Sequence, residues 1–196
     1  MTETRALTRA DILPIERYLA ERREHRQRIA ALKKTRRLEV GPYATLFFEN
    51  FDTMWHQVHE MLAIERGGEA QIADELDAYN PLIPLGDELS ATVMFEIEDP
   101  VRRARELARL GGIEHRLSIA VDGRKIAGLP DPTRENTSPD GKASSVQFIR
   151  FPFDAAAKAR FKEPGAAIVV GFDHPNYGHM AVMPEAVRQA LAGDFT

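Results

Sequence analysis

The sequence of 196 residues contains no cysteine. This absence excludes disulfides, a thiolate nucleophile, a cysteine-ligated zinc site and a cysteine-ligated iron–sulfur cluster. No apolar run approaches the ~18 residues that a membrane span needs, and charged residues interrupt residues 1–20, where a secretory signal would have its apolar centre. We therefore expect a protein without a membrane segment that resides in the cytoplasm.

Motifs that would identify a reaction are also missing. The sequence has no glycine-rich phosphate loop, no dinucleotide fingerprint and no Gly-x-Ser-x-Gly elbow. Nucleotide-binding proteins and serine hydrolases of the elbow type are therefore not indicated. The sequence leaves open whether the protein is an enzyme.

The composition is that of a globular domain, with 43% hydrophobic and 29% charged residues. We expect a single domain over residues 1–196, with a helical N-terminal segment over 1–37 that packs on the body and a surface loop over 128–141. Helical and strand patterns mix along the chain and many connections are short, which predicts an α+β fold with a mostly antiparallel sheet flanked by helices.

Two patterns carry most of this prediction. Residues 88–97 alternate between apolar and mainly polar side chains, as in a strand with one buried face. Asp122-Gly123 separates two strand-like runs and is typical of a tight hairpin. Helices are expected over 15–34, 50–66, 70–79, 100–110, 155–161 and 184–193.

The first long helix is strongly basic. Residues 21–37 contain eight Lys or Arg and two Glu, a charge of +6 within a chain whose formal net charge is −4. The segment has no aromatic residue for base stacking, so we expect it to pair with the acidic body or with a partner protein rather than with nucleic acid.

The helix expected to follow Asn50 contains a candidate metal site. His56, His59 and Glu60 occupy positions i, i+3 and i+4, so one face of the helix offers ligands suited to a divalent transition metal. The alternative is a solvated polar face. Gln57 lies at the edge of the buried stripe, either as a satisfied core amide or as a group that lines a pocket.

A larger set of polar residues flanks apolar runs in the first half of the chain. They form a candidate site for a small ligand, with a structural salt-bridge network as the alternative. The set comprises Lys33, Arg36, Glu49, Gln57, Glu60, Tyr79, Asn80 and Glu96.

The last expected hairpin contains two histidines. His174 and His179 flank four residues, Pro-Asn-Tyr-Gly, and would face each other across a four-residue turn. Opposed side chains have Cβ atoms roughly 4.5–5.5 Å apart, close enough to share a metal. The alternative is a surface hairpin with two unrelated histidines.

Five phrases resemble a bacterial family classed as a domain of unknown function, number 3501 in that series. They are ALKKTRRLEVGP (31–42), FEN (48–50), QVHEMLAIER (57–66), ELDAYNPLIP (75–84) and ELSATVMFEI (88–97). Members of this family are often encoded beside rubrerythrin-like proteins and iron–sulfur oxidoreductases. The resemblance thus implies a role in redox or peroxide stress and partners of these two kinds, but no settled activity or cofactor.

Our leading hypothesis is a cytoplasmic accessory or ligand-binding protein associated with redox-stress proteins. The second hypothesis is a metal-dependent enzyme that uses the His and Glu residues named above. The third is a structural subunit without a small-molecule site, and a homo-oligomer is compatible with all three.

Overall fold

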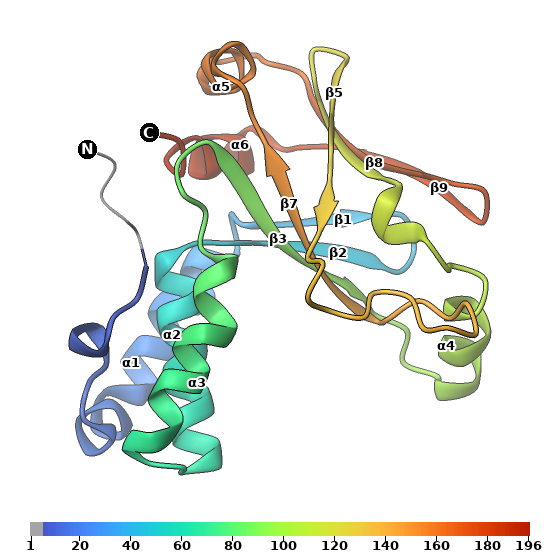
Figure 1. Cartoon of the computed structure of the whole chain (residues 1–196). Coiled ribbons are helices and arrows are strands. Elements are labelled where there is room, and N and C mark those ends of the chain that lie inside the picture. Colours follow the sequence, from blue (N-terminus) through green and yellow to red (C-terminus); the bar gives the residue numbers. More distant parts are fainter. Residues whose placement is uncertain (1–5) are drawn as a thin grey trace.

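The structure, a computed structural model, describes residues 6–196. It consists of two antiparallel sheets flanked by helices, which confirms the predicted α+β fold (Figure 1). The first sheet has the strand order β1-β2-β3-β7-β6, and the second has the order β5-β4-β8-β9. The strands of the first sheet are β1 (Arg37–Val40), β2 (Ala44–Glu49), β3 (Glu88–Phe95), β7 (Val146–Pro152) and β6 (Leu129–Pro130).

The second sheet covers one face of the first. Its strands are β4 (Leu117–Val121), β5 (Arg124–Ala127), β8 (Ile168–His174) and β9 (Tyr177–Val182). Apolar side chains of both sheets form a continuous core that includes Leu46, Val93, Phe151 and Ile119, each 0% exposed. The chain passes from β5 into β6, which pairs with β7, so the two sheets are connected along this edge.

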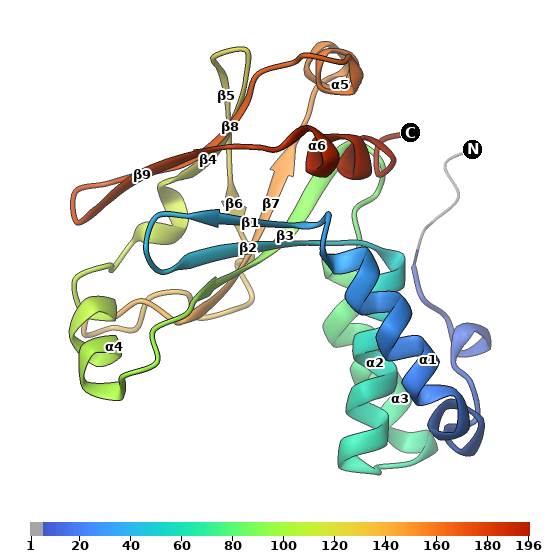
Figure 2. The same ribbon diagram turned by 180° about the vertical axis from the view of Figure 1, so that it is seen from behind.

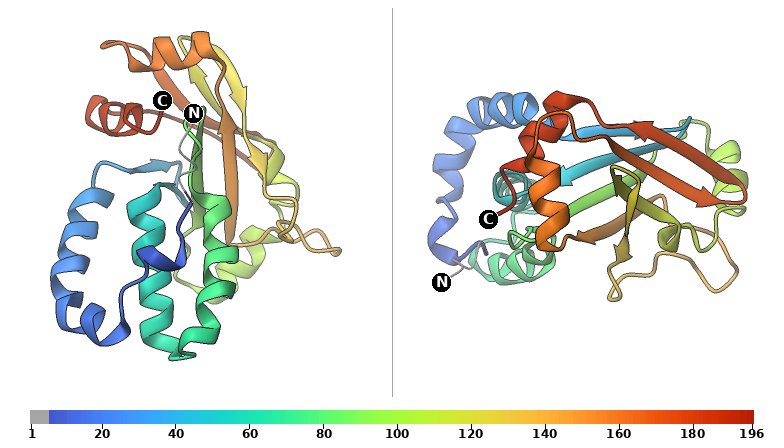
Figure 3. Two further views of the ribbon diagram at one scale, coloured as in Figure 1. Left: turned by 60° about the vertical axis from the view of Figure 1, so that its left-hand side comes forward. Right: turned by 90° about the horizontal axis from the view of Figure 1, so that it is seen from above.

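Three helices form a separate layer beside the sheets (Figure 3). They are α1 (Ile15–Lys33), α2 (Phe51–Glu65) and α3 (Glu69–Tyr79), preceded by the short helix η1 (Arg9–Asp11) and followed by η2 (Asn80–Leu82). The layer has a second, smaller core, which includes Met54, Val58, Leu62 and Ile72. The remaining helices are α4 (Pro100–Leu107), η3 (Ile113–His115), α5 (Ala155–Lys162) and α6 (Glu185–Ala192).

Because side chains alternate between the two faces over residues 88–97, the first sheet contacts both the second sheet and the helical layer. Leu89, Val93 and Phe95 point into the core between the sheets and are at most 3% exposed. Thr92 and Met94 point to the opposite face, which the helical layer partly covers. Because successive strand residues face opposite sides, β3 contributes to the sheet core and to the interface with the helices at once.

The β4–β5 hairpin has the tight turn predicted from the sequence, whereas the β8–β9 hairpin has a shorter turn than predicted. Asp122 and Gly123 connect β4 to β5 in a two-residue turn with positive φ at both positions, 47° and 85°. The β8–β9 turn is also a two-residue turn, since His174 pairs with Tyr177 and Phe172 pairs with His179. The predicted four-residue turn after His174 is therefore wrong.

Tyr177, the first residue of β9, connects the second sheet to the first. Its hydroxyl accepts hydrogen bonds from the backbone N–H groups of Tyr43 (3.0 Å) and Ala44 (2.8 Å) and donates one to the carbonyl of Val40 (2.8 Å). These bonds attach the β1–β2 turn to β9. Figure 2 shows β1 and β9 running beside each other. A shorter β9 would lose this connection between the sheets.

Candidate ligand cavity between the helices and the sheet

A cavity of about 360 Å³ lies between the helical layer and the first sheet, and residues predicted from the sequence line it. A second cavity, of about 450 Å³, lies within the helical layer. We call the first of these the Glu49 cavity. Its polar lining consists of Lys33, Glu49, Gln57, Tyr79 and Thr92. Its apolar lining consists of Phe47, Met54, Leu82, Met94, Val146 and Phe148.

Glu49 owes its position to a direct transition from strand to helix. It is the last residue of β2, and Asn50 caps α2 by accepting a hydrogen bond from the N–H of Thr53 at 3.0 Å. The Thr53 hydroxyl in turn accepts from the Asn50 N–H at 2.9 Å. This reciprocal capping fixes the first turn of α2 against the end of β2.

The carboxylate of Glu49 is buried, with 6% of the residue exposed. It accepts hydrogen bonds from the hydroxyls of Thr53 (2.6 Å) and Thr92 (2.7 Å). Among residues 6–196 no cation lies within ion-pair distance of it. A buried carboxylate of this kind favours a ligand that brings hydrogen-bond donors or positive charge, because its desolvation is compensated by hydroxyls alone.

The other polar groups of the cavity are less constrained. Gln57 and Tyr79 are half-buried, and the Gln57 amide nitrogen lies 3.4 Å from the Tyr79 hydroxyl, a long hydrogen bond. Lys33, in the last turn of α1, forms no ion pair within the described part of the chain. The cavity thus offers a carboxylate, an ammonium group and an amide–hydroxyl pair to an occupant.

The structure brings four of the eight sequence-predicted ligand residues to this cavity, namely Lys33, Glu49, Gln57 and Tyr79. The other four do not line it. Asn80 binds the backbone of Leu7 through both ends of its amide, at 2.7 and 3.0 Å, and Glu96 accepts a hydrogen bond from the Thr45 hydroxyl at 2.6 Å.

Arg36 does not line the cavity; it is buried and binds the end of β2 to Asp194. Its guanidinium donates to the carbonyls of Phe48 (2.9 Å) and Glu49 (3.0 Å) and forms an ion pair with Asp194, near the end of the chain. Arg36 is 3% exposed. It therefore attaches β2 and the segment after α1 to the residues that follow α6.

Glu60, the last of the eight, belongs to a cluster between α1 and α2. Arg22 donates to both oxygens of its carboxylate at 2.9 Å, and the Tyr18 hydroxyl donates to one oxygen at 2.8 Å. The hydrogen bond from Arg22, with that from Tyr18, holds the pKa of Glu60 at about 2 against the opposing effect of burial. Burial and the same hydrogen bond raise the pKa of Tyr18.

His56 lies in the same cluster. Its Nδ1 is 3.0 Å from the Tyr18 hydroxyl oxygen. Because that hydroxyl gives its only proton to Glu60, Nδ1 of His56 has to be the donor of this bond. Burial lowers the pKa of His56 to about 4, so the ring is neutral at pH 7.

His59 is fully buried, with 0% exposure. Its Nε2 accepts a hydrogen bond from the Leu13 N–H at 3.0 Å, and its Nδ1 lies 2.7 Å from the carbonyl of Trp55. Both ring nitrogens are thus occupied in the neutral tautomer, and burial lowers the pKa of His59.

These contacts correct both readings of the histidine face of α2. The face is not solvated, because it packs against α1 and the segment before it. Nor does it present a metal site, since no group of three or more His, Asp or Glu in residues 6–196 is arranged to hold a metal ion. The polar groups that a metal would need are already used by Arg22, Tyr18 and the Leu13 backbone.

His174 and His179 are not opposed either. In the observed register they lie diagonally, and Nδ1 of His174 accepts a hydrogen bond from the Asn176 N–H at 3.2 Å. His179 packs on the β1–β2 turn at Gly41, where an added Cβ would lie 2.6 Å from the His179 ring. The predicted direct opposition of the two histidines is therefore wrong, because the turn contains two residues and not four.

The sequence analysis missed the two threonines that hold Glu49. A signal for Thr53 was present, because a threonine three residues after Asn50 satisfies a capping pattern. Thr92 falls on the polar face of the alternating strand, but nothing local shows that it would meet Glu49, which is 43 residues away in the sequence.

Fold and site together define an α+β protein with a cavity between a helical layer and an antiparallel sheet. The chain belongs to the family described as "Protein of unknown function (DUF3501)", which matches residues 6–195. A crystal structure of a protein of unknown function from Burkholderia pseudomallei K96243 is 40% identical, with 100% of both chains covered and a TM-score of 0.90. The comparison with curated proteins gave no match. No helix in residues 6–196 is long and apolar enough to cross a membrane.

Proposed function

We propose that this protein is an accessory protein that binds a small molecule in the Glu49 cavity. The observation that supports this function is the buried Glu49 carboxylate, which accepts hydrogen bonds from two hydroxyls and faces a cavity without a cationic partner within residues 6–196. A structural role alone does not require a carboxylate at this position, since an apolar or amide side chain would avoid its desolvation.

The lining suggests the class of ligand. Glu49 favours an ammonium, amidinium or guanidinium group, and the apolar lining from β2, β3 and β7 favours a compact hydrocarbon or aromatic body. A cavity of about 360 Å³ is at the small end of the range for ligand sites. The proposed ligand is therefore a small organic cation, with Lys33 available to an acceptor on the same molecule.

Binding of benzylamine, compared with its neutral analogue benzyl alcohol, tests this proposal by calorimetry. We expect the wild-type protein to bind the amine at least about tenfold more tightly than the alcohol, since a charge-assisted hydrogen bond differs from a neutral one by about 1.4 kcal/mol or more. Glu49→Gln should remove this preference. Glu96→Gln, which changes an exposed glutamate outside the cavity, is the matched control and should retain it.

An equal affinity for both compounds in the wild-type protein, or a preference that survives Glu49→Gln, would contradict the proposal. A native mass spectrum of freshly isolated protein adds an independent measurement, because a ligand retained from the cell appears as added mass. That mass should be absent from the Glu49→Gln variant.

We also propose that the protein resides in the cytoplasm and works with rubrerythrin-like or iron–sulfur oxidoreductase partners in redox or peroxide stress. This part is supported by the family resemblance alone. Affinity purification from peroxide-treated and untreated cells tests it, with Glu49→Gln as the comparison. Recovery of neither partner class under either condition would remove the redox assignment and leave the ligand-binding proposal unaffected.

A further inference from the structure

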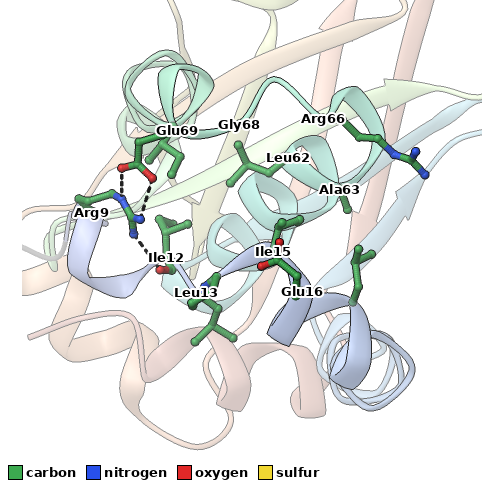
Figure 4. Close-up of a pocket in the computed structure, with 13 residues that line it drawn as sticks. Arg9, Ile12, Leu13, Ile15, Glu16, Leu62, Ala63, Arg66, Gly68 and Glu69 are labelled. Atoms are coloured by element: carbon green, nitrogen blue, oxygen red, sulfur yellow. Dashed lines mark hydrogen bonds and ion pairs between the residues drawn. The ribbon is translucent and has the colours of Figure 1, made fainter.

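A second cavity lies in the helical layer, and its lining is separate from that of the Glu49 cavity. It has a volume of about 450 Å³ and opens between the start of α1 and the α2–α3 connection (Figure 4). Residues 7–14, which we call the strap, and the first turns of α1 form one wall. Most of its lining is apolar and includes Ile12, Ile15, Leu19, Leu62, Ala63 and Ile72.

Specific contacts fix the strap to α2 and α3 beside the cavity. The Arg9 guanidinium forms a bidentate ion pair with Glu69 of α3, at 2.5 and 2.8 Å. Asp11 accepts a hydrogen bond from the Trp55 indole N–H through its carbonyl at 2.8 Å, and Leu13 donates to His59. With the strap fixed at these points, the apolar walls remain separated by a space wide enough for a ligand.

The small side chain of Ala63 contributes to this space. Along α2, Leu62 and Ala63 face the cavity, whereas the next residue, Ile64, is 64% exposed to solvent. Leu19, on the opposite wall, is 47% exposed although it is a large apolar residue. An aliphatic ligand would cover Leu19 and contact Ala63 at the same time.

Charged groups at the rim indicate the polar end of such a ligand. Arg66 follows α2 in the left-handed region, with φ 56° and ψ 32°, and its guanidinium has no hydrogen bond or ion pair within residues 6–196. Figure 4 shows this side chain extending from the edge of the cavity, well apart from the Arg9–Glu69 pair. Glu16 is the other charged residue of the lining without a partner in the described chain.

We propose that this second cavity binds one straight-chain aliphatic carboxylate of medium length, with the hydrocarbon chain between Ile15 and Ala63 and the carboxylate at Arg66. The apolar walls match the chain, and the guanidinium provides planar, paired donors for the carboxylate. The negative charge of Glu16 repels the ligand carboxylate. Removal of this charge should therefore strengthen binding if the ligand is an anion.

Calorimetry with octanoate, decanoate and the neutral analogue octanol tests the inference on the full chain. We expect one binding site, an affinity that rises about fourfold for each added methylene, and tighter binding of octanoate than of octanol. Arg66→Gln should weaken octanoate binding by about threefold to tenfold, and Glu16→Gln should strengthen it. Neither change should alter the affinity for octanol.

A pair of variants on α2 locates the binding site. Ala63→Phe fills the cavity and should abolish binding, whereas Ile64→Phe adds an aromatic ring outside the cavity and should leave binding unchanged. If Ala63→Phe does not fold, Arg66→Gly serves instead, because glycine suits the left-handed conformation while removing the guanidinium. That variant should bind octanoate as weakly as Arg66→Gln does.

Three results would overturn the inference. They are the absence of binding by all three compounds, octanoate binding that Ala63→Phe leaves unchanged in folded protein, and octanol binding as tight as octanoate binding. Glu49→Gln should have no effect on octanoate. The outcome is therefore distinguishable from that for the Glu49 cavity.

Discussion

The two packed regions of the chain are stabilised by different kinds of contact. The core between the sheets consists of aliphatic and aromatic side chains, such as Val93, Phe151 and Ile119. The helical layer buries His59 and Tyr18 completely, and their polar atoms are satisfied by specific partners. Apolar packing tolerates changes of pH and charge, whereas a buried polar network depends on the protonation state of each member. The helical layer, which lines both cavities, is therefore the region that solution conditions should affect first.

The largest effect is expected where the two regions are joined. Arg36→Met leaves the Asp194 carboxylate without its guanidinium and also removes donors to the carbonyls of Phe48 and Glu49. We expect a loss of about 3–5 kcal/mol in the free energy of unfolding, measured by urea denaturation. The double variant Arg36→Met/Asp194→Leu should recover a large part of this loss. If the double variant is no more stable than Arg36→Met, the ion pair is not what makes the junction sensitive.

The second effect is a dependence of stability on pH. Burial lowers the pKa of His56 to about 4 and also lowers that of His59, whereas the usual pKa of a histidine in an unfolded chain is about 6.5. Between these values the unfolded state binds more protons, so the free energy of unfolding should decrease as the pH falls from about 6.5 to 4, by up to about 3 kcal/mol for His56.

Glu60 contributes in a lower pH range. Its pKa is about 2 in the folded protein against a usual value of 4.5, so its contribution is present above pH 4.5 and is lost as the pH falls towards 2. Urea denaturation between pH 7.5 and 4.5 thus isolates the histidines. The slope should be shallower in His56→Gln/His59→Gln, and an unchanged slope would mean that other groups cause the acid sensitivity.

The smallest effect concerns the sheets. Tyr177→Phe removes the hydroxyl that connects β9 to the β1–β2 turn and leaves the N–H groups of Tyr43 and Ala44 without their acceptor. We expect a loss of about 1–3 kcal/mol with little dependence on pH. Amide hydrogen exchange should become faster at Tyr43 and Ala44 and remain unchanged at Leu13 in the helical layer. Faster exchange at Leu13 would show that the two regions do not respond separately.

The parts of the fold that follow from local patterns could be predicted from the sequence. The alternation over 88–97 specifies β3 because one face of the strand is buried throughout, and Asp122-Gly123 specifies a turn because both residues accept positive φ. The His174–Tyr177 pairing was not predictable in this way. The hydroxyl of Tyr177 meets the β1–β2 turn more than 130 residues earlier in the chain, a contact that no local pattern indicates.

The candidate site shows the same division. Lys33, Glu49, Gln57 and Tyr79 could be grouped because each is a polar residue beside an apolar run, and the structure brings them to one cavity. Arg36 and Glu60 looked the same in the sequence, but each has a charged partner from a distant segment, Asp194 and Arg22. His59 looked like a metal ligand, and no local pattern indicates that its partner is a backbone N–H.

The chain contains one tryptophan, and its surroundings make it a natural optical reporter. The Trp55 indole donates to the strap at Asp11, and its ring lies 4.1 Å, centroid to centroid, from that of His59. A strap that detaches would expose the indole to water, and a protonated imidazole beside it would quench its fluorescence. Emission from unlabelled protein thus follows the state of the helical layer alone, at micromolar concentrations and in real time.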